Sequence, residues 1–210
     1  MDIKYFDNSA TTRVKEEVLN EMLPFLSIEY GNPSSMYGIG RSAKRAIEEA
    51  RKRVASLINC KPEEIYFTSC GSESDNTALK GIADKYNEKG KYIITSKIEH
   101  PAILHTAQNL ERHGYNVTYV DVDKNGIINL EKLQNAINSE TILISIMFAN
   151  NEIGTIEPIK KISEIAHKHG IIFHTDAVQA VGNIPIDVQK LGIDMLSLSG
   201  HKLYAPKGIG

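Results

Sequence analysis

The residues best suited to chemistry lie near the C-terminal end, in the segment Ser199-Gly200-His201-Lys202. They follow the apolar run from Met195 to Leu198, which predicts a short buried strand that ends in a turn. A lysine at such a turn loses part of its hydration, which lowers the pKa of its amine and makes the amine a nucleophile. Taken alone, these four residues favour a turn with a solvated lysine.

A carboxylate in the preceding part of the chain favours a chemical role for Lys202. Asp176 ends an earlier apolar run, in the segment His174-Thr175-Asp176-Ala177-Val178-Gln179. A lysine that forms a Schiff base and an aspartate that pairs with a pyridinium nitrogen are the two protein groups on which pyridoxal phosphate chemistry depends most. A site of this kind also needs groups that hold a phosphate and an aromatic ring.

The segment from Thr68 to Asn76 is the candidate phosphate site, because it joins an apolar run to a predicted helix. Gly71 permits a tight turn, Ser72 offers a hydroxyl, and the free backbone N–H groups at a helix start hold anions. Ser72 and Asp75 are also spaced almost as in a helix capping box, and the acidic Glu73 and Asp75 oppose an anion unless they point away. On this segment alone, capping is the better interpretation.

Two further polar groups follow predicted strands. His100 precedes Pro101 at a strand-to-helix turn, where a histidine either stacks on an aromatic ligand or bonds to the backbone. Asn150 and Asn151 follow the apolar run from Ile142 to Phe148. An amide at this position either closes a turn or donates a hydrogen bond to a ring hydroxyl.

Two other kinds of site are disfavoured. Residues 38–43, Gly-Ile-Gly-Arg-Ser-Ala, fit a dinucleotide-binding pattern, but the turn formers Asn32-Pro33-Ser34-Ser35 precede them instead of a buried strand. His174 and Asp176 share one face of a predicted strand, yet no third metal ligand lies at a suitable spacing. We therefore predict neither a nucleotide fingerprint nor a metal site.

The composition is that of an ordinary globular chain. It has 210 residues, 41% of them hydrophobic and 24% charged, with a net charge of -2. Nothing in it predicts a nucleic-acid or membrane surface, and the N-terminal residues lack the apolar core of a signal peptide. Cys60 and Cys70 make no disulfide framework and are predicted to be small buried residues, although Cys70 near a helix start keeps a minor possibility of reactivity. The reducing cytoplasm is the expected compartment.

Hydrophobic patterns predict alternating strands and helices. Helical spacing is found over residues 13–25, 38–58, 74–88, 101–113, 130–137 and 159–169. Strand-like runs occupy residues 65–68, 92–95, 116–122, 142–148, 171–175 and 195–198. This alternation predicts an α/β fold of three layers, α/β/α, around a mainly parallel sheet, as one domain over residues 1–210. Ligands bind such sheets beyond the carboxyl ends of the strands, where the polar clusters lie.

Taken together, the motifs resemble the cysteine desulfurases of the NifS/IscS type. These belong to the class V aminotransferase group of fold-type I pyridoxal phosphate enzymes, so the resemblance implies a PLP-dependent transferase-like large domain. It covers essentially the whole chain and is carried by Asp7 to Thr12, Gly31 to Ser35, Thr68 to Asn76, Glu99-His100, Asn150 to Gly154, His174 to Gln179 and Ser199 to Lys202.

The resemblance also implies a role for each site residue. Lys202 would carry pyridoxal phosphate and move protons, and Asp176 would pair with the ring nitrogen. His100 would stack on the ring and assist acid–base steps. The ring hydroxyl would be contacted by Gln179 and Asn151. The phosphate would be held by Gly71, Ser72, Ser199 and His201.

The implied reaction converts L-cysteine to L-alanine and passes the sulfur to an enzyme cysteine as a persulfide, for iron–sulfur cluster or thiolated tRNA synthesis. The implied partners are an iron–sulfur scaffold or another sulfur acceptor protein, and a second copy of the chain in a homodimer. Two alternatives stay open. One is a selenocysteine lyase or another class V enzyme, and the other is a non-catalytic domain that binds a sulfur-transfer partner.

Two departures from the family pattern qualify this expectation. Tyr37 stands where relatives commonly have a histidine. The family's persulfide cysteine and its arginine for the substrate carboxylate lie in a C-terminal portion, whereas this chain stops at Gly210 and neither of its cysteines matches by position. We therefore expect an incomplete large domain without the C-terminal small domain, and weak or absent turnover by this chain alone.

Overall fold

The computed structural model describes residues 4–210, which are built around a five-stranded sheet with the strand order β2-β1-β3-β4-β5. Every neighbouring pair of strands is parallel, as the alternation of strands and helices predicts. The strands are β1 (Tyr92–Ser96), β2 (Asn116–Val120), β3 (Thr141–Ser145), β4 (Ile172–Asp176) and β5 (Met195–Ser197).

Helices cover both faces of this sheet, because successive residues of a strand point to opposite sides. Ile93 of β1 packs in one core with residues of α3 and α4, whereas its neighbour Ile94 packs in a second core with residues of α5 and α6. The covering helices are α3 (Gly71–Lys85), α4 (Pro101–Arg112), α5 (Leu130–Ala136), α6 (Ile159–Lys168) and the short α7 (Val188–Leu191). The predicted three-layer α/β/α architecture is therefore confirmed.

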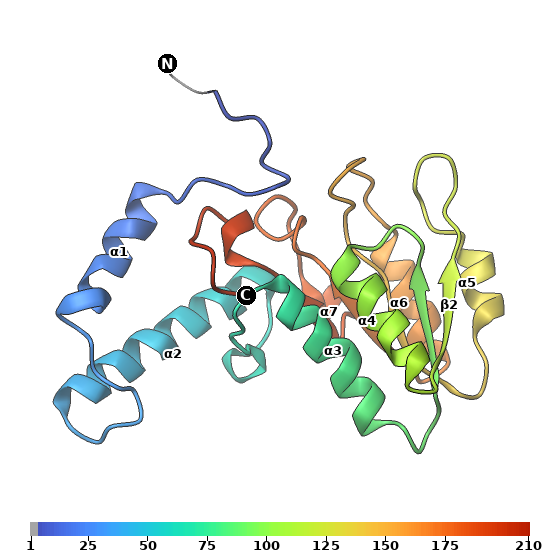
Figure 1. The fold of residues 1–210 in the computed structure, drawn as a ribbon, viewed down its shortest axis with the longest axis horizontal. Helices are drawn as coiled ribbons and strands as arrows, with labels where there is room; N and C mark the ends of the chain where they lie inside the picture. Colours follow the sequence, from blue (N-terminus) through green and yellow to red (C-terminus); the bar gives the residue numbers. More distant parts are fainter. Residues whose placement is uncertain (1–3) are drawn as a thin grey trace.

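Two N-terminal helices extend away from the sheet, α1 (Glu16–Ser27) and α2 (Gly38–Ile58) (Figure 1). No residue of α1 is buried, and Leu26 is 73% exposed. Further apolar side chains of this region, Leu19, Leu23, Ile39, Ile47 and Leu57, also face solvent in the single chain. Within residues 4–210, no helix combines the length and the apolar character needed to cross a bilayer.

The strand predicted over residues 65–68 is wrong. The segment follows a short 3-10 helix, η1 (Pro62–Glu64), and is extended, but it pairs with no strand of the sheet and Tyr66 is 81% exposed. Thr68 instead exchanges two backbone hydrogen bonds with Gly210, of 2.8 and 2.9 Å. An apolar, aromatic run has the composition of a strand whether or not a neighbouring strand lies beside it, so composition alone misassigned it.

The ends of two further elements differ from the predicted ends. Helix α3 begins at Gly71, three residues before the predicted start, and β3 ends at Ser145 instead of residue 148. Beyond β3 the chain stays beside β4, since the Ile146 and Phe148 amides donate to the carbonyl oxygens of His174 and Asp176 at 3.1 and 2.8 Å. The short α7 was not predicted, because four residues are too few to show helical periodicity.

Candidate active site

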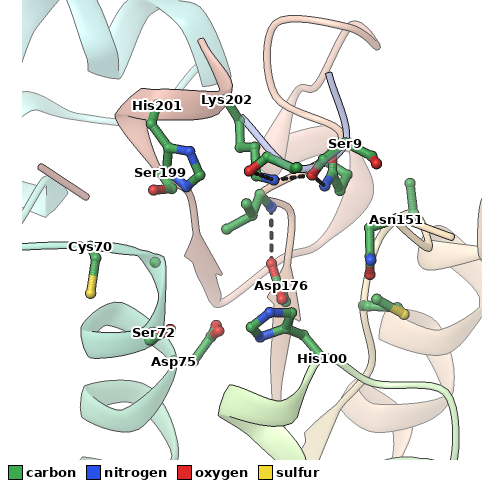
Figure 2. A pocket seen from close by; sticks show the side chains of 16 residues that line it. Ser9, Cys70, Ser72, Asp75, His100, Asn151, Asp176, Ser199, His201 and Lys202 are labelled. Atoms are coloured by element: carbon green, nitrogen blue, oxygen red, sulfur yellow. Dashed lines mark hydrogen bonds between the residues drawn. The ribbon is translucent and has the colours of Figure 1, made fainter. Parts of the chain in front are cut away.

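A cavity of about 360 Å³ opens beyond the carboxyl ends of the strands (Figure 2). All of the predicted site residues line it: Gly71, Ser72, His100, Asn151, Asp176, Gln179, Ser199, His201 and Lys202. They come from α3, from the turns after β1, β3 and β4, and from the 3-10 helix η2 (Gly200–Lys202) that follows β5. The parallel sheet brings them together because all its strands end at the same edge.

Asp176 lies at the floor of this cavity, as the last residue of β4, and is 6% exposed. One carboxylate oxygen, Oδ1, accepts a hydrogen bond from the Val178 amide at 2.9 Å. Burial raises the pKa of Asp176, while that amide and the positive charges of His100 and Lys202 act to lower it. A buried carboxylate with one oxygen fixed and a lysine amine above it is well placed to pair with a cationic ring.

Lys202 ends η2 and points into the cavity above Asp176 (Figure 2). Its Nζ donates a hydrogen bond to the Ala10 carbonyl oxygen at 2.9 Å and another to the Ser9 carbonyl oxygen. Burial lowers the pKa of the amine, and the carboxylates of Asp7 and Asp176 partly oppose this. Lys202 is therefore held by protein groups and differs from the solvated turn lysine of the alternative interpretation.

The start of α3 forms one wall of the cavity, and it is not a capping box. Cys70 is the N-cap and makes no side-chain capping bond, so the capping interpretation of Ser72 and Asp75 is wrong. The first N–H groups of a helix have no partner within the helix. Across from them, Ser199 is 2% exposed and its Oγ has no hydrogen-bond partner. A Cβ added at Gly71 would lie 3.3 Å from that of Ser199, so the two face each other closely.

Neither of the two acidic residues at this helix start, Glu73 and Asp75, opposes an anion in the cavity. Glu73 turns back, and its Oε2 accepts hydrogen bonds from the Ser69 amide and hydroxyl at 2.5 and 2.6 Å. Asp75 is buried in the cavity, where burial and the nearby Asp176 raise its pKa. A neutral Asp75 does not repel an anion, so the wall between Gly71 and Ser199 is suited to a phosphate.

At His100 and at the Asn150–Asn151 pair, the structure shows both a bond to the backbone and a side chain in the cavity. His100 caps α4, since its Nδ1 accepts from the Ala102 amide at 3.1 Å, and its ring also lines the cavity beside Asp176 (Figure 2). Asn150 closes its turn: Oδ1 accepts from the Glu152 and Ile153 amides at 2.9 and 3.1 Å. Asn151 lines the cavity.

Because Asn150 closes a turn and Asn151 lines the cavity, we expect different consequences when each is replaced. Asn150→Ala should lower the free energy of unfolding by about 1–3 kcal/mol, because two backbone donors lose their acceptor. Asn151→Ala should leave that free energy nearly unchanged and should weaken the binding of a ligand in the cavity instead. Urea unfolding of both variants, paired with titration of pyridoxal phosphate, measures the two effects. Equal losses of stability in the two variants would contradict this division.

A third buried acid, Glu99, lies behind the cavity. Its Oε1 accepts hydrogen bonds from the Ser96 hydroxyl and the Met147 amide, at 2.6 and 2.9 Å, and its Oε2 has no partner. Burial raises the pKa of Glu99 to about 8. The carboxyl is therefore protonated in the folded protein at neutral pH, although it is ionised in the unfolded chain.

Stability should consequently fall as the pH rises toward 8. Between the unfolded pKa of Glu99, near 4.5, and the folded value of about 8, the folded state binds one more proton than the unfolded state. Each pH unit in this window therefore costs up to about 1.4 kcal/mol. Glu99→Gln keeps the acceptor for Ser96 and Met147 but does not titrate, so its stability should fall less steeply. Urea unfolding at pH 5.5 to 8 compares the slopes, and identical slopes would refute the assignment.

The cavity also contains residues that were not predicted to line it. Ser9 and Ala10 line it from the N-terminal side, and Cys70 and Asp75 line it from the N-cap and first turns of α3. The signal available was the turn-forming run from Asp7 to Thr12, which predicts a loop but not what the loop contacts. Thr12 shows the long reach of this segment, because its amide donates to the His201 carbonyl oxygen at 3.0 Å.

His174 and Asp176, the two residues weighed for a metal site, are bonded to other groups. His174 lies between the hydroxyls of Ser145 and Ser197, at 2.9 and 3.0 Å, and burial lowers its pKa to about 3. Asp176 accepts from the Val178 amide at 2.9 Å. In the part of the chain that the structure describes, no three histidine, cysteine or acidic side chains converge.

Comparisons with known proteins identify the family of the chain. The family described as Aminotransferase class-V matches residues 4–210. The cysteine desulfurase IscS of Methanosarcina thermophila is 60% identical over 206 residues, which are 98% of this chain and 51% of that protein. The IscS of Clostridium botulinum strain Kyoto is 58% identical, with 98% of this chain and 52% of that protein covered. This chain thus spans about half the length of the curated relatives it matches.

Solved structures give the same result for the fold. A NifS-like protein superposes with a TM-score of 0.96 at 45% identity, covering 98% of this chain and 57% of the other. A structure described as SspA in complex with cysteine also gives 0.96 at 45% identity, covering 99% of this chain and 60% of the other. With the family matched from residue 4 to residue 210, this chain belongs to the class V aminotransferases.

Proposed function

We propose that this chain carries the pyridoxal phosphate site of a cysteine desulfurase. The observation that carries the proposal is the pairing of Lys202 and Asp176 in one cavity, within a chain 60% identical to a cysteine desulfurase. Enzymes of this family depend on pyridoxal phosphate in general. The proposed reaction takes L-cysteine and a thiol to L-alanine and a persulfide, so one C–S bond breaks and one S–S bond forms.

The donor set of the cavity fits pyridoxal phosphate in three respects. Lys202 supplies an amine for the aldehyde, and the buried Asp176 supplies a carboxylate for the ring nitrogen. The orphaned Ser199 hydroxyl and the free N–H groups at Gly71 and Ser72 supply donors for the phosphate. When bound, the cofactor contributes a ring that stabilises negative charge on the substrate Cα.

The chain's own residues would divide the remaining work. Asp176 would stay ionised and keep the ring nitrogen protonated. Lys202, once released, would hold the proton that moves at the substrate Cα, for which its lowered pKa is suited. His100 has Nδ1 committed to the Ala102 amide, so a neutral ring carries its proton on Nε2 and acts as a donor in the cavity. Gln179 and Asn151 would orient the ring and the substrate, and His201 would support the phosphate.

The proposal extends to the setting of the site. We propose that these residues form the cofactor-binding domain, that sulfur passes to an iron–sulfur scaffold or another acceptor protein, and that two copies of the chain associate. The exposed apolar side chains of α1 and α2 support association. The free thiols of Cys60 and Cys70 are compatible with the cytoplasm as the proposed compartment.

The test is production of L-alanine from L-cysteine in the presence of pyridoxal phosphate and an excess of dithiothreitol as sulfur acceptor. We expect alanine and sulfide in equal amounts, formed at a low rate because residues 1–210 contain neither the family's persulfide cysteine nor its arginine for the substrate carboxylate, and none from L-serine, which has no sulfur. L-selenocysteine, assayed in parallel, separates a lyase preference from a desulfurase. A protein that binds the cofactor but releases alanine from neither sulfur nor selenium substrate would refute the proposed reaction.

A further inference from the structure

Two backbone carbonyl groups converge on the nitrogen of Lys202. The Ser9 and Ala10 carbonyl oxygens both accept hydrogen bonds from Nζ, the second at 2.9 Å. Ser9 and Ala10 line the same cavity as Asp176 (Figure 2). Two carbonyl oxygens aimed at one nitrogen form a site for a primary ammonium group, because such a group has three N–H donors and no acceptor.

The turn that carries these carbonyls, Asp7–Ala10, is held in place without Lys202. Asp7 Oδ1 accepts hydrogen bonds from the Ser9 hydroxyl and the Ala10 amide, at 2.8 and 3.3 Å. The Ala10 amide also donates to the Asp7 carbonyl oxygen at 3.1 Å, and Gln179 Nε2 donates to the Ser9 carbonyl oxygen at 3.0 Å. Two residues on, Thr12 is anchored to the His201 carbonyl oxygen. The carbonyls therefore stay aimed at the cavity when the lysine nitrogen moves away.

We propose that the Ser9 and Ala10 carbonyl oxygens form the subsite for the amino group of the amino-acid substrate. This inference rests on the proposed function. An amino acid that displaces Lys202 from the cofactor would bring its own nitrogen to the same carbon: a C=N bond to the substrate nitrogen would replace the C=N bond to Lys202, and the hydrogens given up by the substrate ammonium would pass to the lysine nitrogen. The two nitrogens thus occupy one place in turn.

The energetics favour the same assignment. If Lys202 withdraws, the Ala10 carbonyl oxygen loses this donor and the Ser9 carbonyl oxygen keeps only Gln179 Nε2. A substrate ammonium restores both hydrogen bonds. A substrate analogue without the amino group restores neither, so the subsite selects primary amines.

The test uses the protein without cofactor. Lys202→Ala removes the resident nitrogen and its hydrogen bonds to both carbonyl oxygens, and ethylammonium is the probe at pH 7. We expect saturable binding, with changes in the NMR signals of the Ser9, Ala10 and Thr11 amides. Tetramethylammonium, which has the same charge but no N–H donor, should not bind there, and neither should ethanol. Wild-type protein, with Lys202 in place, should not respond to ethylammonium. Lys202→Ser provides a second vacated site if the alanine variant folds poorly.

Changes at Asp7 separate the carbonyl geometry from simple charge attraction. Asp7→Ala, added to Lys202→Ala, removes the oxygen that holds Ser9 and Ala10, and should weaken ethylammonium binding on the order of tenfold. Asp7→Asn keeps an oxygen acceptor in the same place and should retain most of the affinity. Equal losses in both would show that the Asp7 charge attracts the probe, and this result would overturn the proposal, as would equal binding of tetramethylammonium.

These outcomes are distinct from a failure of the proposed function. Ethylammonium binding to Lys202→Ala, together with no reaction between wild-type protein and pyridoxal phosphate, would refute the cofactor site alone. A normal cofactor adduct in wild type, with no ethylammonium binding in either Lys202 variant, would refute the amine subsite alone.

Discussion

Replacing Lys202 with alanine is expected to abolish the covalent adduct with pyridoxal phosphate and to lower the turnover of L-cysteine by on the order of 10⁴-fold or more. Lys202 is the lysine whose amine reaches the cavity, where burial lowers its pKa and so makes the free amine more available as a nucleophile. Visible absorbance before and after borohydride reduction, followed by mass spectrometry of the trapped peptide, measures the adduct directly.

Lys207→Ala is the matched control for this experiment. Lys207 lies five residues further along the chain and is exposed, so its loss should leave both the adduct and the turnover unchanged. A borohydride-trapped adduct that persists in Lys202→Ala would place the reactive amine elsewhere. An adduct in neither variant nor wild type would mean that these residues do not assemble the cofactor site.

Asp176→Asn is expected to lower turnover on the order of 10²–10³-fold while the cofactor adduct still forms. Asparagine has the shape of aspartate but no charge, so it cannot keep a ring nitrogen protonated, and the ring withdraws electrons less strongly. The absorbance of the bound cofactor and the kcat for alanine formation distinguish this loss from failure to bind, which would mainly reduce occupancy.

Asp75→Asn provides the comparison, since both acids line the same cavity. Burial and the charge of Asp176 raise the pKa of Asp75, so the wild-type carboxyl is largely neutral at pH 7 and its replacement by a neutral amide should change turnover little. The difference in turnover between wild type and Asp75→Asn should grow above pH 8, because Asp75 ionises there whereas asparagine does not. A larger loss of turnover in Asp75→Asn than in Asp176→Asn would mean that Asp75 is the ionised acid and Asp176 the neutral one.

Much of this architecture could be predicted because it depends on local patterns. Helical periodicity placed α2 at Gly38–Ile58 with both ends correct, and buried apolar runs placed the strands of the parallel sheet. The rule that ligands bind at the carboxyl ends of parallel strands also predicts that Asp176, His100 and Lys202 lie together. The resemblance to a family supplied their expected roles, which the periodicity of the sequence does not contain.

The remainder depended on distant contacts and on burial. Residues 65–68 have a strand's composition, yet only the assembled sheet shows that no strand lies beside them. The carbonyls of Ser9 and Ala10 belong to residues of no special chemistry, and they matter because of where the chain folds back. Asp75 was expected to oppose an anion, and only its burial beside Asp176 shows that it is largely neutral.

The hydrogen bonds between Thr12 and His201 also bear on how the molecule is made, because they join residues 189 positions apart. During synthesis at about 5–20 residues per second, the N-terminal segment would wait roughly 10–40 s before its partner leaves the ribosome. The sheet can begin to pair earlier, since β1, β2 and β3 are close in sequence. Within residues 4–210, the cavity is therefore among the last parts to close during synthesis, and a chain interrupted before residue 201 would have much of its sheet but would lack Lys202.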